Sequence, residues 1–168
     1  MIAHRRCRRC SFWKVGLCCI KPSPLQKVTA VMKMKFEKAK LRLEKDSAIF
    51  SIGAVSYSLI EILWRHYTHW TMAITGGLCF VILFRLFNKM RRISMIKKCA
   101  IGSGVITSVE FAVGCIVNIG FKMNVWDYSA MPLNLFGQIC IVYSFLWGLL
   151  SIPIVFLSDK LRTKFFVK

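Results

Sequence analysis

Polar side chains recur at helical spacing inside one of the chain's long apolar blocks, residues 99–121. They are Ser103, Thr107, Glu110 and Asn118, with Gly114 among them. Successive members lie three or four residues apart, so in a helix they share one stripe about 80° wide. A carboxyl group at this depth in a membrane is costly and commonly marks an ion, proton or substrate site. The stripe is also typical of a helix contact, with Glu110 hydrogen-bonded to a neighbouring span and Gly114 allowing close approach.

A second polar group falls in two short connections between apolar blocks. Its members are Glu61, Trp64, Arg65, His66, His69 and Trp70 in one connection, and Trp126, Asp127 and Tyr128 in the other. The aromatic residues fit the belt at a membrane surface. We expect Arg65 to form an ion pair with Glu61 or Asp127 and so to lock the two connections together.

The sequence gives weak support for a metal site or a catalytic set. His66 and His69 could bind a metal, but they have no obvious third ligand. Zinc could also be bound by Cys7, Cys10, Cys18 and Cys19, although adjacent cysteines are poor partners in a tetrahedral site. The other cysteines are Cys79, Cys99, Cys115 and Cys140, which behave as small apolar residues in or beside spans. We expect no disulfide, metal or cofactor, and without a Ser/His/Asp or Cys/His arrangement we expect no enzyme.

Four apolar blocks carry these side chains, at residues 48–64, 70–87, 99–121 and 135–157. A bilayer core of about 30 Å needs roughly 20 helical residues. The chain is therefore predicted to be an all-α, polytopic membrane protein with four transmembrane helices. The first two blocks are short and close together, so a re-entrant hairpin is the alternative. Two full spans are favoured because Arg85, Lys89, Arg91 and Arg92 form a basic stop after the second block.

The net charge of +18 is distributed unevenly between the connections. Residues 1–47 hold 13 Lys and Arg, residues 85–98 hold six, and the tail after Asp159 holds four. The connections at 64–69 and 122–134 hold one each. Because cytoplasmic loops carry the excess of Lys and Arg, both termini are predicted to be cytoplasmic, in a multi-pass protein of the cell (inner) membrane.

The basic N-terminal part predicts a helix of its own. Val28, Met32, Phe36, Ala39 and Leu43 share one helical face, with basic residues elsewhere. This pattern is typical of an amphipathic helix on a membrane surface, so anionic lipid of the inner leaflet is the expected partner. The spans leave too little chain for a nucleic-acid-binding module. The organisation predicted is a basic segment at 1–46, a four-helix transmembrane domain at 47–158, and a basic cytoplasmic tail at 159–168.

Three stretches carry a resemblance to a known family. They are residues 60–72 with 76–80, residues 107–111 with Gly114 and Asn118, and residues 125–129 with Pro132, Asn134, 137–140 and Trp147. Over about residues 50–158 the chain resembles a bacterial membrane-protein family described as putative ABC-transporter permease, type IV (CmpB-like). His66 stands where a small residue, often Gly, is expected.

The resemblance implies a transport-related, permease-like component. The sequence contains no G-x-x-x-x-G-K-[ST] phosphate loop, so a separate ATP-binding subunit would have to supply the energy, docking at the 85–98 connection. We also expect a homo-oligomer, because four short helices alone enclose little space for a transport path. The alternative is a non-transporting membrane scaffold or envelope-associated interaction protein.

Overall fold

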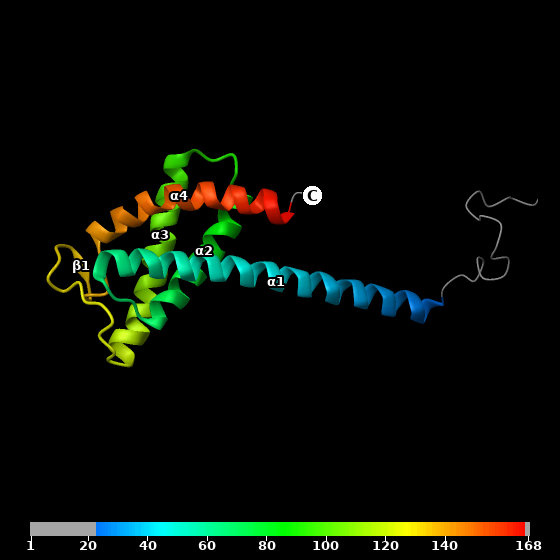
Figure 1. The fold of residues 1–168 in the computed structure, drawn as a ribbon, viewed down its shortest axis with the longest axis horizontal. Coiled ribbons are helices and arrows are strands. Elements are labelled where there is room, and N and C mark those ends of the chain that lie inside the picture. The colour runs from blue at the N-terminus through cyan, green and yellow to red at the C-terminus, as the bar shows by residue number, and fades with distance from the viewer. Residues whose placement is uncertain (1–22, 167–168) are drawn as a thin grey trace, which may run out of the picture. The chain divides into compact units, whose positions relative to one another are not determined.

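The structure is a computed structural model that describes residues 23–166 (Figure 1). The chain divides into two units, Met1–Leu41 and Arg42–Lys168. The elements are α1 (Pro24–Arg65), α2 (Trp70–Lys89), α3 (Met95–Gly114), the π-helix η1 (Cys115–Gly120), β1 (Asn134–Leu135), β2 (Ile139–Cys140) and α4 (Ile141–Phe166). Within these described residues, four helices are long and apolar enough to cross a membrane, which confirms the predicted all-α, four-helix membrane fold.

The first unit contributes the start of α1, and its sequence explains where the helix begins. Pro24 occupies the first helical position, where its missing N–H is not needed. Ser23 and Gln26 exchange hydrogen bonds between side chain and backbone in both directions, at 3.0 and 3.2 Å. This reciprocal cap satisfies two N–H groups at the helix start. The predicted amphipathic segment is helical and exposed, and its contact with lipid stays a prediction.

In the second unit α1 ends where the chain turns into the left-handed region. His66 has φ 62°, and its N–H donates to the Ile62 carbonyl at 2.8 Å. A left-handed residue with such a bond is a common way to end a helix, and it favours Gly. The conformation gives a reason for a small residue at this position. It leaves His66 a role in the turn that does not depend on its imidazole.

Helix α2 is the central helix of the second unit. In its most apolar 18-residue stretch 56% of the residues are buried, against 17–28% in the other three helices. Small residues let α1 approach it closely. A Cβ atom on Gly53 would overlap Phe80, and one on Gly76 would overlap Tyr57. Both α1 and α2 are long enough for a full crossing, which favours two spans over the re-entrant hairpin.

Helix α4 begins six residues later than the apolar pattern predicts. Residues 134–140 instead form a two-stranded antiparallel hairpin in which Asn134 pairs with Cys140. Leu133, Phe136 and Gly137 all have positive φ, at 51°, 52° and 69°, which no α-helix accommodates. At its other end α4 continues to Phe166, so part of the basic tail is helical. Figure 1 shows α4 crossing α3, and these two helices are in contact.

Candidate functional site

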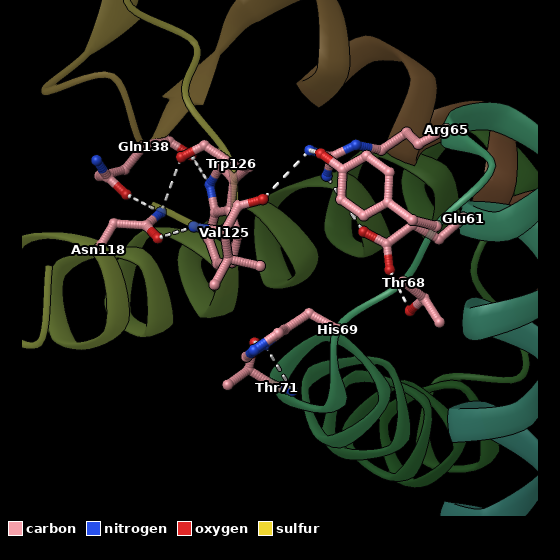
Figure 2. Close-up of polar contacts among 10 residues, drawn as sticks. Glu61, Arg65, Thr68, His69, Thr71, Asn118, Val125, Trp126 and Gln138 are labelled. Carbon is pink, nitrogen blue, oxygen red and sulfur yellow. Dashed lines mark hydrogen bonds and ion pairs between the residues drawn. The ribbon is translucent and has the colours of Figure 1, made fainter. Parts of the chain in front are cut away.

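Arg65 joins the two connections at one end of the helices, here called the loop end (residues 66–69 and 121–140). Its Nη1 donates to Glu61 Oε1 at 3.2 Å, and its Nη2 donates to Tyr67 Oη at 2.7 Å. The same Nη2 donates to the Val125 carbonyl oxygen at 3.2 Å (Figure 2). The expected pair with Glu61 is thus present. The link to the second connection runs through a backbone carbonyl and not through Asp127.

Glu61 is the acidic residue of this link, and it is buried (6% exposed). Besides the ion pair with Arg65, its Oε2 accepts a hydrogen bond from Thr68 Oγ1 at 2.5 Å (Figure 2). A buried carboxylate is tolerated when it is paired and hydrogen-bonded. Glu61 therefore holds the first connection against the end of α1.

Asn118 organises the second connection from the π-helix η1. Its Oδ1 accepts the Val125 N–H at 2.8 Å, and its Nδ2 donates to the Trp126 carbonyl at 3.0 Å and to Gln138 Oε1 at 2.8 Å. The Trp126 indole N–H donates back to the Gln138 carbonyl at 3.0 Å (Figure 2). Asn118, Trp126 and Gln138 are all buried. We call these residues, with Val125, the Asn118 network.

Asp127 and Tyr128 lie beside this network with contacts of their own. Asp127 is exposed, and it accepts hydrogen bonds from the Ser129 hydroxyl at 2.6 Å and the Ser129 N–H at 2.8 Å. These two bonds, that of the hydroxyl first, lower the pKa of Asp127 below its ordinary value. Tyr128 stacks on Tyr143 of α4 with ring centroids 4.6 Å apart.

The remaining predicted residues of this end are not drawn into the link. Trp64 and Trp70 are 69% and 63% exposed, as residues of an interfacial belt would be. His69 caps α2, since its Nδ1 lies 2.7 Å from Thr71 Oγ1 and accepts the Thr71 N–H (Figure 2). Within residues 23–166 no group of three or more His, Cys, Asp or Glu could hold a metal ion. Cys7, Cys10, Cys18 and Cys19 lie outside the described residues.

The polar stripe of α3 divides into two parts with different partners. Ser103 and Thr107 bond Ser144 of α4: Ser103 Oγ donates to its carbonyl at 2.5 Å and Thr107 Oγ1 to its hydroxyl at 3.1 Å. Gly114 leaves room for the loop end, since a Cβ there would lie 2.6 Å from Gln138 Oε1. Asn118 belongs to the Asn118 network. These four positions make contacts that hold α3 to α4 and to the loop end.

Glu110 differs from the rest of the stripe. It is 2% exposed, and its Oε2 accepts the indole N–H of Trp147 in α4 at 2.6 Å. The Tyr57 ring of α1 lies beside Trp147, with ring centroids 6.1 Å apart. Side chains of α1, α3 and α4 therefore meet at the middle of the apolar block.

A cavity of about 150 Å³ borders Glu110. Residues of all four helices line it: Gly53, Ser56, Tyr57, Ile60, Thr75, Gly76, Cys79, Phe80, Ile106, Glu110, Leu150, Pro153, Ile154 and Leu157. Glu110 is the one carboxylate among them. A cavity of this size holds a group about as large as benzene.

One family model decides the affiliation of the chain. The family is described as putative ABC-transporter type IV, and its model matches residues 48–168. The chain belongs to this family. Neither a curated protein nor a solved structure gave a significant match. As a member of the ABC-transporter type IV family with four apolar helices, it is a multi-pass membrane protein related to transport.

Several residues of the site were not predicted as site residues from the sequence. They are Tyr57, Thr68, Gln138, Ser144 and Trp147. Thr68, Gln138 and Trp147 stand in stretches that carry the family resemblance, which was a usable signal. Ser144 is an ordinary hydroxyl residue near a helix end, and nothing in its spacing marks it.

Proposed function

We propose that the chain is a permease-like component of a bacterial transport system, driven by a separate ATP-binding subunit. The observation that carries the proposal is the cavity at Glu110. It lies among four helices that could cross a membrane, and Glu110 is the one acidic side chain among lining residues that are mostly apolar. Pockets with few convergent polar groups are where proteins bind small molecules. Membership in the ABC-transporter type IV family supports the same role.

The proposal places both termini and the connection between α2 and α3 in the cytoplasm, because these segments carry the Lys and Arg excess. Arg91 and Arg92 in that connection are exposed, and they are the residues we assign to docking the ATP-binding subunit. The chain itself is assigned no catalytic reaction. A cavity of about 150 Å³ is not a continuous path, so the proposal includes a homo-oligomer.

The test is copurification of ATP hydrolysis with the tagged chain. The chain is purified from native membranes in mild detergent, and vanadate-sensitive ATPase activity is measured per mole of chain. The double variant Arg91→Glu/Arg92→Glu should lower that activity about tenfold, because like-charge contacts at an interface rim weaken docking. The matched control is Lys160→Glu/Lys164→Glu, which makes the same charge change at exposed positions of α4.

A non-transporting scaffold is the second candidate, and one observation favours it. Ser103, Thr107 and Asn118 are engaged in contacts between parts of the same chain, as expected of residues that hold helices together. A purified complex with no ATPase activity, but with stoichiometric envelope proteins that survive cross-linking, would favour the scaffold over the transporter.

A further inference from the structure

The cavity at Glu110 opens between α1 and α4. The residues that α2 and α3 contribute to its lining are all buried, namely Thr75, Gly76, Cys79, Phe80, Ile106 and Glu110. The exposed lining residues belong to the other two helices, Ser56 and Ile60 to α1 and Pro153 to α4. Helices α2 and α3 therefore form the floor of the cavity, and its entrance lies between α1 and α4.

The cavity lies far from the ends of the helices that form its floor. The lining residues of α2 fall at 75–80 within Trp70–Lys89, and those of α3 fall at 106–110 within Met95–Gly120. Both ranges are the middle of helices that could cross a membrane. At that depth a multi-pass protein is surrounded by lipid chains, so a molecule reaches the entrance from the hydrocarbon of the bilayer. This position favours a ligand with an apolar body.

The charge of the lining is one-sided. Glu110 supplies its one carboxyl group, and within the part of the chain that the structure describes no Lys, Arg or His lines the cavity. Trp147 donates to Glu110 Oε2 at 2.6 Å, but a carboxylate has about four acceptor sites and can accept further bonds. A buried carboxylate is costly until a positive group or a hydrogen-bond donor compensates it. A ligand with a positive nitrogen would do so.

The groups around Glu110 favour the same kind of ligand. The Thr75 hydroxyl donates to the Thr71 carbonyl at 2.8 Å, so its oxygen is left as an acceptor. The rings of Tyr57 and Phe80 line the same cavity, and aromatic faces attract ammonium groups. The carboxyl group, the hydroxyl oxygen and the two rings thus share a preference for a positively charged N–H donor.

We propose that this cavity binds a small lipophilic amine, with its nitrogen at Glu110 and its apolar body toward the entrance between α1 and α4. The volume of about 150 Å³ holds a body about as large as benzene. An ammonium–carboxylate pair carries no net charge, so each partner lowers the cost of placing the other in an apolar interior. The inference rests on the proposed function, because it names the ligand class of the cavity that carries that proposal.

Binding of radiolabelled benzylamine to the full-length chain in nanodiscs tests the ligand class, with binding to empty discs subtracted. Unlabelled benzylamine, benzyl alcohol and benzoate compete for the site, since they are similar in size and differ in charge. We expect benzylamine to compete at a concentration at least tenfold lower than benzyl alcohol, and benzoate not to compete. Equal competition by the amine and the alcohol, or the absence of saturable binding, overturns the proposal.

A variant of Glu110 locates the nitrogen. Glu110→Gln keeps an acceptor but removes the charge, so it should weaken benzylamine binding at least tenfold and leave competition by benzyl alcohol unchanged. Glu61→Gln is the matched control, because Glu61 is also a buried glutamate and does not line the cavity. It should bind benzylamine as the wild type does. Wild-type binding by Glu110→Gln would overturn the assignment of the nitrogen to Glu110.

A variant of the rim locates the entrance. Ser56→Phe places a ring at an exposed lining position, so it should weaken the binding of benzylamine and benzyl alcohol alike. Val55→Phe is the control, because Val55 is exposed on α1 and does not line the cavity. Wild-type binding by Ser56→Phe would overturn the assigned entrance.

The binding assay contains no ATP and no second subunit, so it separates this inference from the proposed function. Benzylamine binding that depends on Glu110, in a chain that copurifies with no ATPase activity, would support the amine site and contradict the transport role. An ATPase activity that falls in Glu110→Gln, without saturable benzylamine binding to the wild type, would support transport and overturn the amine as ligand.

Discussion

The Asn118 network and the surroundings of Glu110 use polar side chains in opposite ways. Both lie on the same stripe of α3 and its continuation in η1, and both are buried. In the network every partner of Asn118 is a group of the loop end. Glu110 accepts the Trp147 indole N–H and borders a cavity of about 150 Å³.

Under the proposed function, the difference separates a structural role from a binding role within one helix face. A fully satisfied buried network fixes one conformation, and each lost partner leaves an uncompensated polar group. A carboxyl group at a cavity wall keeps the capacity to contact something else. Burial alone therefore does not mark Glu110 as a binding residue, whereas the cavity beside its side chain does.

The largest effect should come from Asn118→Leu, which breaks the network at its centre. The change leaves the Val125 N–H, the Trp126 carbonyl and the Gln138 amide without their partner. We expect the free energy of unfolding to fall by about 4 kcal/mol, since each unsatisfied buried group costs about 1–3 kcal/mol. SDS titration in mixed micelles measures it. Ile119→Ala, at an exposed position of the same π-helix, should cost far less.

Arg65→Met should have the next largest effect, because it separates the two connections of the loop end. It leaves Glu61 buried with Thr68 as its remaining partner and frees the Val125 carbonyl. Arg65 is 26% exposed, so water can replace part of what is lost, and we expect a cost of about 2 kcal/mol.

The same SDS titration can separate the two bonds of Arg65. Glu61→Gln removes the charge of its partner but keeps the Val125 link, so it should cost less than Arg65→Met. Equal costs would show that the link to Val125 contributes nothing.

Glu110→Gln tests the contrast between Glu110 and the Asn118 network, because it should leave the free energy of unfolding nearly unchanged. The glutamine carbonyl can still accept the Trp147 N–H, so the free energy of unfolding should change by less than about 1 kcal/mol. Under the proposed function, the ATPase activity of the purified complex should nevertheless fall about tenfold. Trp147→Phe is the companion variant, since it removes the N–H donor and retains the carboxyl group.

The difference between Asn118 and Glu110 would be contradicted if Glu110→Gln destabilised the chain as much as Asn118→Leu and lowered its abundance in the membrane. That result would place Glu110 among the structural contacts of the stripe. An unchanged ATPase activity with unchanged stability would instead remove Glu110 from the proposed mechanism.

The sequence predicts the number of spans well because apolar blocks and helix crossings have the same physical cause. It misplaces the start of α4 because Leu133, Leu135 and Phe136 are apolar but lie in and beside the hairpin. Their exposed side chains extend the apolar pattern, while the positive φ values that stop a helix have no strong signature outside Gly137. Element boundaries set by backbone conformation are thus less predictable than elements set by hydropathy.

The candidate site was predictable in its residues but not in its partners. Helical spacing alone is enough to predict that Glu110 and Asn118 lie on one stripe. The hydrogen-bond partner of Glu110, Trp147, lies 37 residues away in α4. A single sequence does not show which residues of two helices lie side by side. The link from Arg65 ends on the Val125 carbonyl, a group that every residue has, so side-chain chemistry pointed to Asp127 instead.

The smallest expected effect concerns Asp127, which stands outside both regions and tests whether the loop end is sensitive to acid. The two bonds from Ser129 hold the pKa of Asp127 below its ordinary value. A depressed carboxyl pKa contributes stability above the unfolded value of about 4, and that stability is lost as pH falls through the folded pKa. Ser129→Ala removes the hydroxyl bond, so the carboxyl group should titrate at a higher pH, nearer the ordinary value.

Carbon-detected NMR titration of the labelled Asp127 carboxyl measures this shift. Ser129→Thr, which keeps both bonds, should titrate as the wild type does. Identical titration of Ser129→Ala and the wild type would show that the backbone N–H alone sets the pKa. Because Asp127 is exposed, neither variant should alter the Asn118 network, and a change in unfolding at neutral pH would mean that the two are coupled.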